Sequence, residues 1–406
     1  MTVVLSGQIF NVSANQIDTF DIVFAGGTLN VLSGGTTSET FLEPSSMGIS
    51  GGQEAVLSGG TAIETLVFNG AIQNIFQGTA INGFIFSGGT EVVELGSSVR
   101  TTVEGGGVQE VFAGGITSAS NLGVNGGGPG TEDVFAGGTA IGTTVGSGTI
   151  NVAGTAIGTI VGNGGTENIF NGGTASGTIV SNGGTEEVVG GTAFGTIVSS
   201  GGEEDVFGGG TAIGTILRGF GFQDVSQGGT ASGTIISAGH VEVFAGGTAV
   251  GTVISGGFEQ VLAGGTASDT TIAGGTLDVF SGASITGPIT FTNAGGILEL
   301  GDSQSFLGTI AGFASPSGVT EEIDLLDISF GKKTKVSFKE AQDKLSGTLT
   351  VTDGTHTANL TLLGQYSANQ FSLASDGHGG TMVTDPQHPP SLVGSAASPV
   401  LAAQPT

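Results

Sequence analysis

A short tag, Gly-Thr-Ala, recurs along most of this 406-residue chain and constrains its fold more than any other feature. From Thr155 to Thr266 the tag returns every 18 or 19 residues. Self-similarity at a fixed short period is typical of chains that stack one supersecondary unit on the next. The threonine of the tag is Thr61, Thr79, Thr139, Thr155, Thr174, Thr192, Thr211, Thr230, Thr248 and Thr266.

Each repeat divides into two halves of about nine residues, as in 173–181 and 184–191. A half holds three to five β-favouring residues, for example Thr-Ile-Val or Asp-Val-Phe, between glycines. Such runs suit a strand and are too short for a helix, and glycine permits the positive-φ corners of a tight coil. The sequence therefore predicts an all-β fold, a parallel β-solenoid (β-helix) with rungs of about 18–19 residues.

Two columns of β-branched residues recur in register, one in each half of the repeat. We expect both columns to stack into apolar ladders at the β spacing of about 4.8 Å, because a single rung cannot bury its apolar face. The first column contains Val31, Val56, Ile75, Val111, Val134, Ile169, Val188, Val206, Val225, Val243, Val261 and Val279. The second column contains Ile160, Ile179, Ile197, Ile216, Ile235 and Val253.

Phenylalanine often follows the residue of the first column. Strict alternation would point this ring outward, whereas a bend at the following glycines would turn it into the core. The inward orientation is the expectation, and an exposed aromatic stripe that serves as a docking surface is the alternative. The residues are Phe76, Phe112, Phe135, Phe170, Phe207, Phe244 and Phe280.

Composition excludes several classes of protein. The 81 glycines come with only 9 prolines and no Gly-X-Y period, which excludes collagen, and 37% hydrophobic residues suffice for a packed core. A net charge of −27 with seven Lys plus Arg excludes electrostatic binding to nucleic acid or to an anionic membrane. There is no cysteine, so the fold does not depend on disulfides.

A different region is expected from about residue 289, because the tags stop at Thr266 and all five lysines fall between Lys332 and Lys344. Its pattern predicts a small antiparallel β region with hairpins at Asp353-Gly354 and at 376–380, and one helix at 337–345. Five of the nine prolines lie beyond Asp385, which predicts disorder there. The predicted domains are a solenoid at 1–288, a β-rich module with an export or capping role at 289–386, and a disordered Pro/Ala-rich tail at 387–406.

The segment 172–188, Gly-Gly-Thr-Ala-Ser-Gly-Thr-Ile-Val-Ser-Asn-Gly-Gly-Thr-Glu-Glu-Val, resembles the AIDA-type repeat of bacterial autotransporter adhesin passengers. The resemblance spans about 20–285, since tag, period and column types all agree. It implies a non-catalytic structural or adhesive repeat protein, secreted or displayed on a bacterial surface, whose partner is an extracellular surface or matrix ligand. The chain departs from a conventional autotransporter, because neither a Sec signal nor a C-terminal membrane barrel is found.

The C-terminal region resembles end modules of large bacterial repeat proteins, including those exported by type I systems. The residues that carry this second resemblance are 323–326, Ile-Asp-Leu-Leu, and 375–386, which begin Ser-Asp-Gly-His-Gly-Gly. It implies an uncleaved C-terminal export signal, in agreement with an N-terminus that has no cationic and no apolar signal segment.

No catalytic, cofactor-binding or metal-ligating residue is predicted. Calcium-binding nonapeptide repeats need an aspartate that 172–177 lacks, and the glycine runs are not followed by Lys-Ser/Thr as a phosphate loop requires. The pair Asp376 and His378 is interpreted as part of a turn. The four histidines, none of which lies in a catalytic motif, are His240, His356, His378 and His388.

Clustered carboxylates leave one alternative function open, a β-helical carbohydrate-active enzyme that acts as a polysaccharide lyase or hydrolase. A catalytic pair should break the periodicity, whereas these acids follow it, and Arg218 is the one basic residue nearby. The non-catalytic function is therefore favoured. The clusters are Glu132-Asp133, Glu186-Glu187 and Glu203-Glu204-Asp205.

The residue before each core valine forms a largely acidic column. Two full charges at about 4.8 Å repel by roughly 1 kcal/mol in water and by about 3–4 kcal/mol at an effective dielectric of 20. The side chains either splay into solvent or bind weak divalent cations on a patch of Glu186, Glu187, Glu204 and Asp205. The column contains Asn168, Glu187, Asp205, Asp224, Glu242, Gln260 and Asp278.

Overall fold

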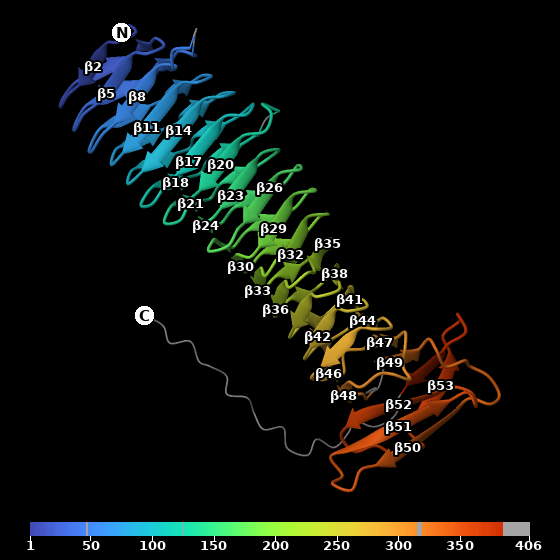
Figure 1. Cartoon of the computed structure of the whole chain (residues 1–406). Coiled ribbons are helices and arrows are strands. Elements are labelled where there is room, and N and C mark those ends of the chain that lie inside the picture. The colour runs from blue at the N-terminus through green and yellow to red at the C-terminus, as the bar shows by residue number, and fades with distance from the viewer. Residues whose placement is uncertain (46–47, 125, 315–318, 385–406) are drawn as a thin grey trace. The chain divides into compact units, whose positions relative to one another are not determined.

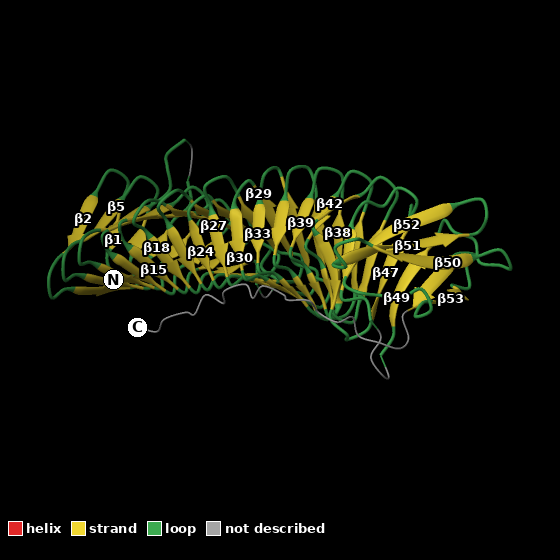
Figure 2. Ribbon diagram, turned by 90° about the horizontal axis from the view of Figure 1, so that it is seen from below, coloured by secondary structure: helices red, strands yellow, loops and turns green. Residues whose placement is uncertain are grey.

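A computed structural model describes residues 1–45, 48–124, 126–314 and 319–384. The described residues form strands and turns (Figure 2), with no helix and hence none that could cross a membrane. The fold is the predicted one, a parallel β-solenoid of about 16 turns of roughly 19 residues, with antiparallel strands near the C-terminus. The chain divides into two compact units, 1–252 and 253–406, which are described separately.

Each rung of the first unit has three strands, where the sequence pattern predicted two. The half-repeat that carries the Gly-Thr-Ala tag holds two strands, Thr174–Ser176 and Ile179–Val180, which the corner at Gly177 separates. Successive rungs pair in parallel on all three sides, and Figure 1 shows the strands stacked rung upon rung.

The three sheets of the first unit differ in strand length. The first sheet has two-residue strands: β1 (Val3–Val4), β4 (Ile22–Val23), β7 (Phe41–Leu42), β10 (Leu66–Val67), β13 (Phe84–Ile85), β16 (Thr102–Val103), β19 (Asn121–Leu122), β22 (Thr144–Val145), β25 (Ile160–Val161), β28 (Ile179–Val180), β31 (Ile197–Val198), β34 (Ile216–Leu217) and β37 (Ile235–Ile236). The second sheet has strands of four or five residues: β2 (Ile9–Val12), β5 (Thr28–Val31), β8 (Gln53–Val56), β11 (Ile72–Phe76), β14 (Thr90–Glu94), β17 (Val108–Val111), β20 (Thr131–Val134), β23 (Thr149–Val152), β26 (Thr166–Ile169), β29 (Thr185–Val189), β32 (Glu203–Phe207), β35 (Gly221–Val225) and β38 (Gly239–Val243). The third sheet has three-residue strands: β3 (Ile17–Thr19), β6 (Thr36–Ser38), β9 (Thr61–Ile63), β12 (Thr79–Ile81), β15 (Ser97–Val99), β18 (Ile116–Ser118), β21 (Thr139–Ile141), β24 (Thr155–Ile157), β27 (Thr174–Ser176), β30 (Thr192–Phe194), β33 (Thr211–Ile213), β36 (Thr230–Ser232) and β39 (Thr248–Val250).

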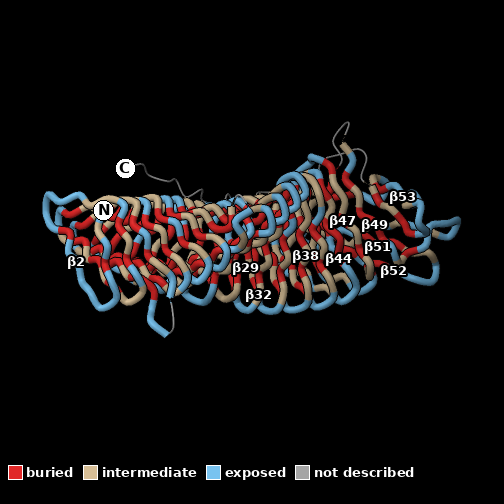
Figure 3. The backbone as a smooth tube through the Cα atoms, turned by 90° about the horizontal axis from the view of Figure 1, so that it is seen from above, coloured by how far each residue is buried: buried red, intermediate tan, exposed pale blue. Residues whose placement is uncertain are grey.

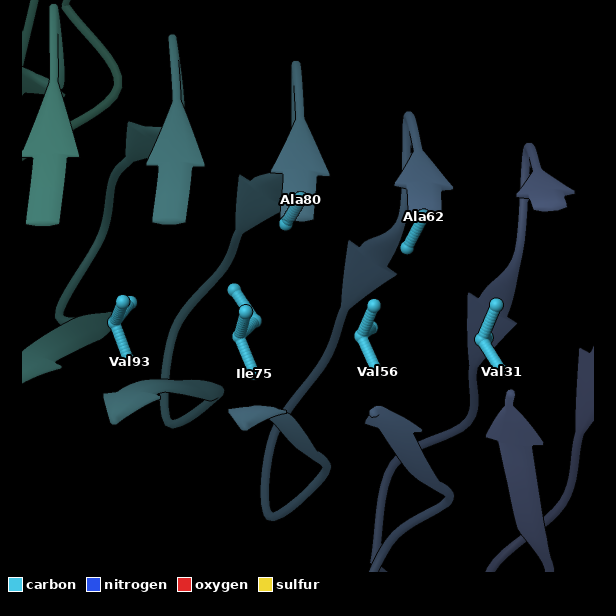
Figure 4. Packing of buried hydrophobic residues seen from close by; sticks show 6 residues of the cluster. All are labelled: Val31, Val56, Ala62, Ile75, Ala80 and Val93. Atoms are coloured by element: carbon cyan, nitrogen blue, oxygen red, sulfur yellow. The ribbon is translucent and has the colours of Figure 1, made fainter. Parts of the chain in front are cut away.

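The core is a set of apolar ladders that run along the inside of the coil. Val31, Val56 and Ile75 stand in a row on the second sheet, and Ala62 and Ala80 face them from the third sheet (Figure 4). Buried positions alternate with more exposed ones along the backbone, as Figure 3 shows. The predicted first column is confirmed as a buried ladder, because all twelve of its residues are buried.

The second predicted column is wrong in its orientation. Ile160 and Ile179 are 45% and 41% exposed, and the residues after them, Val161 and Val180, point into the core. In a two-residue strand one side chain must point outward, and the alternation along the rung makes it the first of the two.

The expected inward orientation of the phenylalanine column is also wrong. Phe76, Phe135, Phe170 and Phe280 are about 40% exposed, and the other three rings are half-buried. The strand keeps strict alternation through the core residue, so the next side chain emerges on the outer face. The rings of Phe112 and Phe135 stack on each other there, with centroids 4.6 Å apart.

Glycines at the rung boundaries have two different roles. Gly177 has a φ of 67°, which is the positive-φ corner that the sequence predicted. Gly173 has no positive φ, but a Cβ there would lie 2.1 Å from the carbonyl oxygen of Val152 in the previous rung. Glycine at this second position therefore allows consecutive rungs to approach closely.

The second unit contains further three-sided coils and then antiparallel hairpins. Its strands are β40 (Val253–Ile254), β41 (Phe258–Val261), β42 (Thr266–Ser268), β43 (Thr271–Ile272), β44 (Thr276–Val279), β45 (Ser284–Thr286), β46 (Pro288–Phe291), β47 (Gly296–Leu300), β48 (Thr309–Ala311), β49 (Glu321–Leu325), β50 (Lys335–Glu340), β51 (Ser346–Thr352), β52 (Thr357–Leu363), β53 (Ser372–Ser375) and β54 (Thr381–Thr384).

Both predicted hairpins form, β51 with β52 and β53 with β54. The predicted helix at 337–345 is wrong, because β50 occupies its first half and a turn follows. Val336 and Phe338 alternate with exposed neighbours at the period of a strand, and β51 offers an antiparallel partner. Parallel pairing continues past residue 288 through β46, β47 and β48, so the proposed domain boundary stays a prediction. The predicted tail at 387–406, with His388, lies outside the described residues.

Candidate functional site

The predicted acidic column is a continuous row on the outer face of the second sheet. Strands β26, β29, β32, β35 and β38 pair in parallel and in register, so the residue before each core position is directly opposite its equivalent in the next rung. The row over these five rungs is Asn168, Glu187, Asp205, Asp224 and Glu242.

Three carboxylates from the adjacent strands β32 and β35 lie close together on this outer face. Glu203, Asp205 and Asp224 each offer an oxygen, and these oxygens lie within 4.8 Å of one another. All three side chains are half-buried. Beside them, His240 lies 3.3 Å from Glu242, measured from Nε2 to Oε1, and its ring stacks on Phe222. We call Glu203, Asp205 and Asp224 the acidic trio.

The environment of Asp205 and Asp224 favours their protonated forms. Burial raises the pKa of Asp205 to about 7, and the neighbouring charges of Glu203, Asp224 and Glu187 act in the same direction. Burial raises the pKa of Asp224 to about 6, and Glu242 and Glu203 again add to the effect. A cation at the trio would relieve this repulsion, because it stabilises the ionised carboxylates.

The cation patch predicted from the sequence is wrong in half of its members. Glu186 and Glu204 are fully buried inside the coil, on the opposite face of the sheet from Glu187 and Asp205. Adjacent residues of a strand point to opposite faces, so a run of neighbouring acids cannot form one patch. The structure instead adds Glu203, which the sequence named only as part of an acidic run.

Glu186 and Glu204 belong to a second polar column, inside the core, that sequence reasoning missed. Each member lies two residues before a core position, so the period of a β-strand could have revealed its inward orientation. The column contains Glu54, Gln73, Glu91, Gln109, Glu132, Glu167, Glu186, Glu204, Gln223 and Glu259, all fully buried.

Hydroxyl and amide donors satisfy most of this inner column. Thr159 and Thr178 each donate to Glu167, with Oγ1–Oε distances of 2.9 Å. Glutamines donate to a glutamate of the adjacent rung, as Gln223 does to Glu204 over 2.6 Å from Nε2 to Oε2. Thr215 also donates to Glu204. Buried carboxyl groups need such donors, because each unpaired group costs about 1–3 kcal/mol.

Glu186 is the one glutamate of the inner column whose carboxyl group receives no such hydrogen bond. In the inner column Glu186 lies between Glu167 and Glu204, which pair with it in register. No hydroxyl or amide group donates a hydrogen bond to either of its carboxyl oxygens. Burial raises the pKa of Glu186 well above its usual range, and the charges of Glu204 and Glu167 raise it further. The surroundings of Glu186 in the solenoid core therefore favour its protonated, neutral form.

The other residues considered from the sequence, Asp376, His378 and His356, lie in turns of the hairpins. Asp376 accepts hydrogen bonds from the backbone N–H groups of His378, Gly379 and Gly380, as expected for a turn. At the tip of the β51–β52 hairpin, Nδ1 of His356 lies 2.9 Å from Oδ2 of Asp353. Among the described residues, the acidic trio is the one group of three or more potential metal ligands, and Arg218 forms no ion pair.

Calcium is expected to stabilise the folded chain through the acidic trio. Hard cations such as calcium bind several carboxylate oxygens at once. A half-exposed site with three carboxylates is expected to bind calcium with a Kd of roughly 1 mM. At about 10 mM calcium, such a site would add about 1.4 kcal/mol to the free energy of unfolding. Melting should be compared in calcium, in magnesium, and in sodium chloride at matched ionic strength.

The double variant Asp205→Asn/Asp224→Asn should lose the rise in calcium. Glu187→Gln, which removes an acid of the same row outside the trio, serves as the control and should keep it. Equal rises in all three salts would reduce the effect to ionic screening and would argue against a site.

Comparison with solved structures shows an extensive similarity to a fragment of another protein. The chain is similar to a solved fragment of TibA that was hyper-glycosylated by TibC, with 30% sequence identity and a TM-score of 0.54. The alignment covers 70% of this chain and 95% of the TibA fragment. Another solved structure, the Dettilon tailspike protein, has 10% sequence identity and a TM-score of 0.16. The alignment covers 85% of this chain and 69% of the tailspike, and this similarity is too low to support a conclusion about fold or function. No family model and no curated protein sequence matches the chain.

Proposed function

The chain belongs to the AIDA-like β-helical repeat proteins, and we propose that it is a non-catalytic structural or adhesive protein, secreted from or displayed on a bacterial surface. Its partner would be an extracellular surface or matrix ligand. The similarity to the TibA fragment over nearly the whole of that fragment supports this function.

The observation that carries the proposal is the repetition of outward-facing side chains. Ile141 and Ile157 on adjacent rungs of the third sheet, and Ile160 and Ile179 on adjacent rungs of the first sheet, are each about 40–45% exposed. A surface on which such side chains recur along the solenoid offers several similar weak contacts, and linked weak contacts add up to strong overall attachment. Adhesion uses such a surface, whereas catalysis needs one specialised place.

The carbohydrate-active enzyme is the alternative, and the acidic trio is the feature in its favour. Carboxyl groups close together occur in glycosidases, but there the acids flank a bound sugar. The trio lies on the outer face of an unbroken sheet, and two of its acids, Asp205 and Asp224, follow the repeat. Only Glu203 departs from it, since Thr185 and Phe222 occupy its position in the adjacent rungs. Incubation of the chain with acidic polysaccharides should therefore release no product above background, and any turnover lost in Asp205→Asn would favour the enzyme.

The producing bacterium is expected to carry the chain outside its membrane and to attach less well without it. Fractionation should find the full chain in the medium or accessible to protease on intact cells. Deletion of the coding sequence should lower attachment to surfaces severalfold, because the repeated contacts are lost together. We also propose that residues 289–406 carry the export information, so a chain of residues 1–288 should stay inside the cell.

These measurements separate the parts of the proposal. A full chain that stays in the cytoplasm would contradict the surface function. If residues 1–288 reach the medium at the normal level, the C-terminal export signal is wrong and the adhesive function is untouched.

A further inference from the structure

The antiparallel sheet of the second unit presents an outer face without a single carboxylate. Strands β50, β51 and β52 pair so that nine side chains form a grid of three rows. The rows are Lys335, Thr352 and Thr357, then Ser337, Thr350 and Asn359, then Lys339, Thr348 and Thr361. We call these nine residues the lysine–threonine face.

The backbone under the lysine–threonine face is held in place by a packed core. On the opposite side of the same strands, Leu349, Val351, Leu360 and Leu362 are fully buried. The ring of Phe338 packs edge-on against Tyr366 with centroids 5.7 Å apart. Since the inner side chains are fixed in a core, the outer ones project from a sheet whose geometry is set before any ligand arrives.

The outer side chains are available to a partner. On β50 and β52 the members of the face are exposed, and on the central strand β51 they are half-buried. Neither Lys335 nor Lys339 forms an ion pair among the described residues. Thr350 and Asn359 hydrogen-bond each other over 2.9 Å, which orients both side chains on the surface.

The charge of the face is opposite to that of the chain. The chain has a net charge of −27, and residues 1–331 contain Arg100 and Arg218 as their only Lys or Arg residues. Two acids border the face. Glu340 directly follows Lys339 at the end of β50 and is exposed, at a position that alternates with the lysines. Asp353 is held in the turn by the backbone N–H groups of Thr355 and His356 and by the His356 ring. Salt screens any charge that lies more than about one Debye length of 8–10 Å from the face, so the local lysines dominate what an approaching anion meets.

We propose that the lysine–threonine face binds an anionic polysaccharide. Lysines four residues apart on one strand stand about 13 Å from each other, which suits successive acidic groups of an extended polymer. The seven hydroxyl and amide side chains between and beside them donate and accept hydrogen bonds, as the hydroxyls of sugars require. This surface is separate from the solenoid faces that the proposed function uses.

Other anionic partners fit the face less well. The grid has no aromatic ring on which a base could stack, and two lysines neutralise little of a phosphate backbone. The acidic row of a second copy of the chain would use the two lysines but would leave the acceptor groups of the face without donors.

The test measures binding of the full chain to immobilised alginate, a linear polymer of uronic acids, with neutral dextran as the reference polymer. The wild-type chain should bind alginate at low ionic strength and bind it more weakly as salt rises. Lys335→Gln/Lys339→Gln should weaken binding about tenfold, which is roughly 1.4 kcal/mol. Thr350→Ala/Asn359→Ala should also weaken it, because the hydrogen-bonding groups at the centre of the face are lost.

The matched control is Lys332→Gln/Lys344→Gln, which changes the net charge equally but lies outside the face. If binding depends on lysines at the face and not only on the net charge of the chain, this control should change alginate binding by less than about twofold. The proposal is overturned by a wild-type chain that does not bind alginate, by equal loss in both lysine variants, or by equal binding to dextran. It is also overturned if sedimentation velocity shows that Lys335→Gln/Lys339→Gln breaks self-association while alginate binding is unchanged. Each of these failures would leave the adhesive function of the solenoid standing.

Discussion

Val206→Asp is expected to lower the free energy of unfolding by more than about 3 kcal/mol. Val206 is fully buried and stacks between Val188 and Val225 of the neighbouring rungs. Aspartate there would be a buried charge without a partner, and the inward carboxyl of Glu204 on the same strand would repel it. The variant should melt at a clearly lower temperature than the wild-type chain.

The damage from Val206→Asp should stay local. Each rung of a solenoid contacts only the rungs beside it, so the loss of one layer opens its neighbours before it reaches distant ones. Limited proteolysis with mass spectrometry should find new cleavage between β26 and β38. Cleavage that starts at the same time in β2 to β11 would contradict the picture of a linear array.

Phe207→Asp is the matched control for this substitution. Phe207 follows Val206 on the same strand, pairs with Val189, and is half-buried on the outer face. Aspartate at this position stays in contact with water, so the free energy of unfolding should change by less than about 1 kcal/mol.

Glu186→Gln is expected to stabilise the chain at pH 8 by about 1–3 kcal/mol. The substitution replaces a buried carboxyl group, to which no hydroxyl or amide donates, with an amide that stays neutral at pH 8 and can donate to Glu167 or Glu204. The chain already contains this arrangement, since Gln73 donates to Glu54 over 2.8 Å and Gln223 donates to Glu204. Melting at pH 8 is the measurement.

The stability of the wild-type chain should fall as the pH rises from 5 to 8. Burial raises the pKa of Glu91 and of Glu167 to about 7, and the pKa of Glu186 lies well above its ordinary value of 4.5. Between the unfolded and the folded pKa the folded state binds more protons, so the free energy of unfolding decreases with rising pH. Glu186→Gln should reduce this slope, and Glu91 and Glu167 should keep part of it.

Glu187→Gln controls for the change in charge. It removes one negative charge from the adjacent position, but Glu187 is on the outer face of the strand. Its effect at pH 8 should be well below that of Glu186→Gln. Equal effects of the two variants, or a wild-type chain that becomes more stable from pH 5 to pH 8, would contradict a raised pKa for Glu186 in the core.

The candidate site could be predicted in part. The row of Glu187, Asp205 and Asp224 follows from the repeat, because parallel rungs in register place equivalent residues side by side. The trio could not be predicted, because it also needs Glu203, from two residues earlier on β32, to lie near Asp224 of the next rung. A repeat pattern shows which residues are equivalent and does not show which residues of different columns touch.

The C-terminal hairpins could likewise be predicted only in part. The turn residues Asp353 and Gly354 predicted β51 and β52, because that dipeptide favours a two-strand reversal over any other local structure. The segment 337–345 has helix-forming residues and was predicted as a helix, yet its first half is β50. Backbone pairing with β51 and the packing of Phe338 outweigh the weak local preference.

By itself, the sequence determined the period of the solenoid, the β character of its rungs and the inward ladder of Val188, Val206 and their equivalents. These follow from spacing and from the rule that buried β-branched residues stack. The tertiary structure decided that the coil has three sides, that Ile179 and Phe170 face solvent, and that Glu186 faces the core. Two neighbouring apolar residues look alike in a pattern, and only the closing of the coil selects which of them is enclosed. The inner glutamates are tolerated because threonines and glutamines of their own and adjacent rungs donate to them, and those donors come together only when the rungs stack.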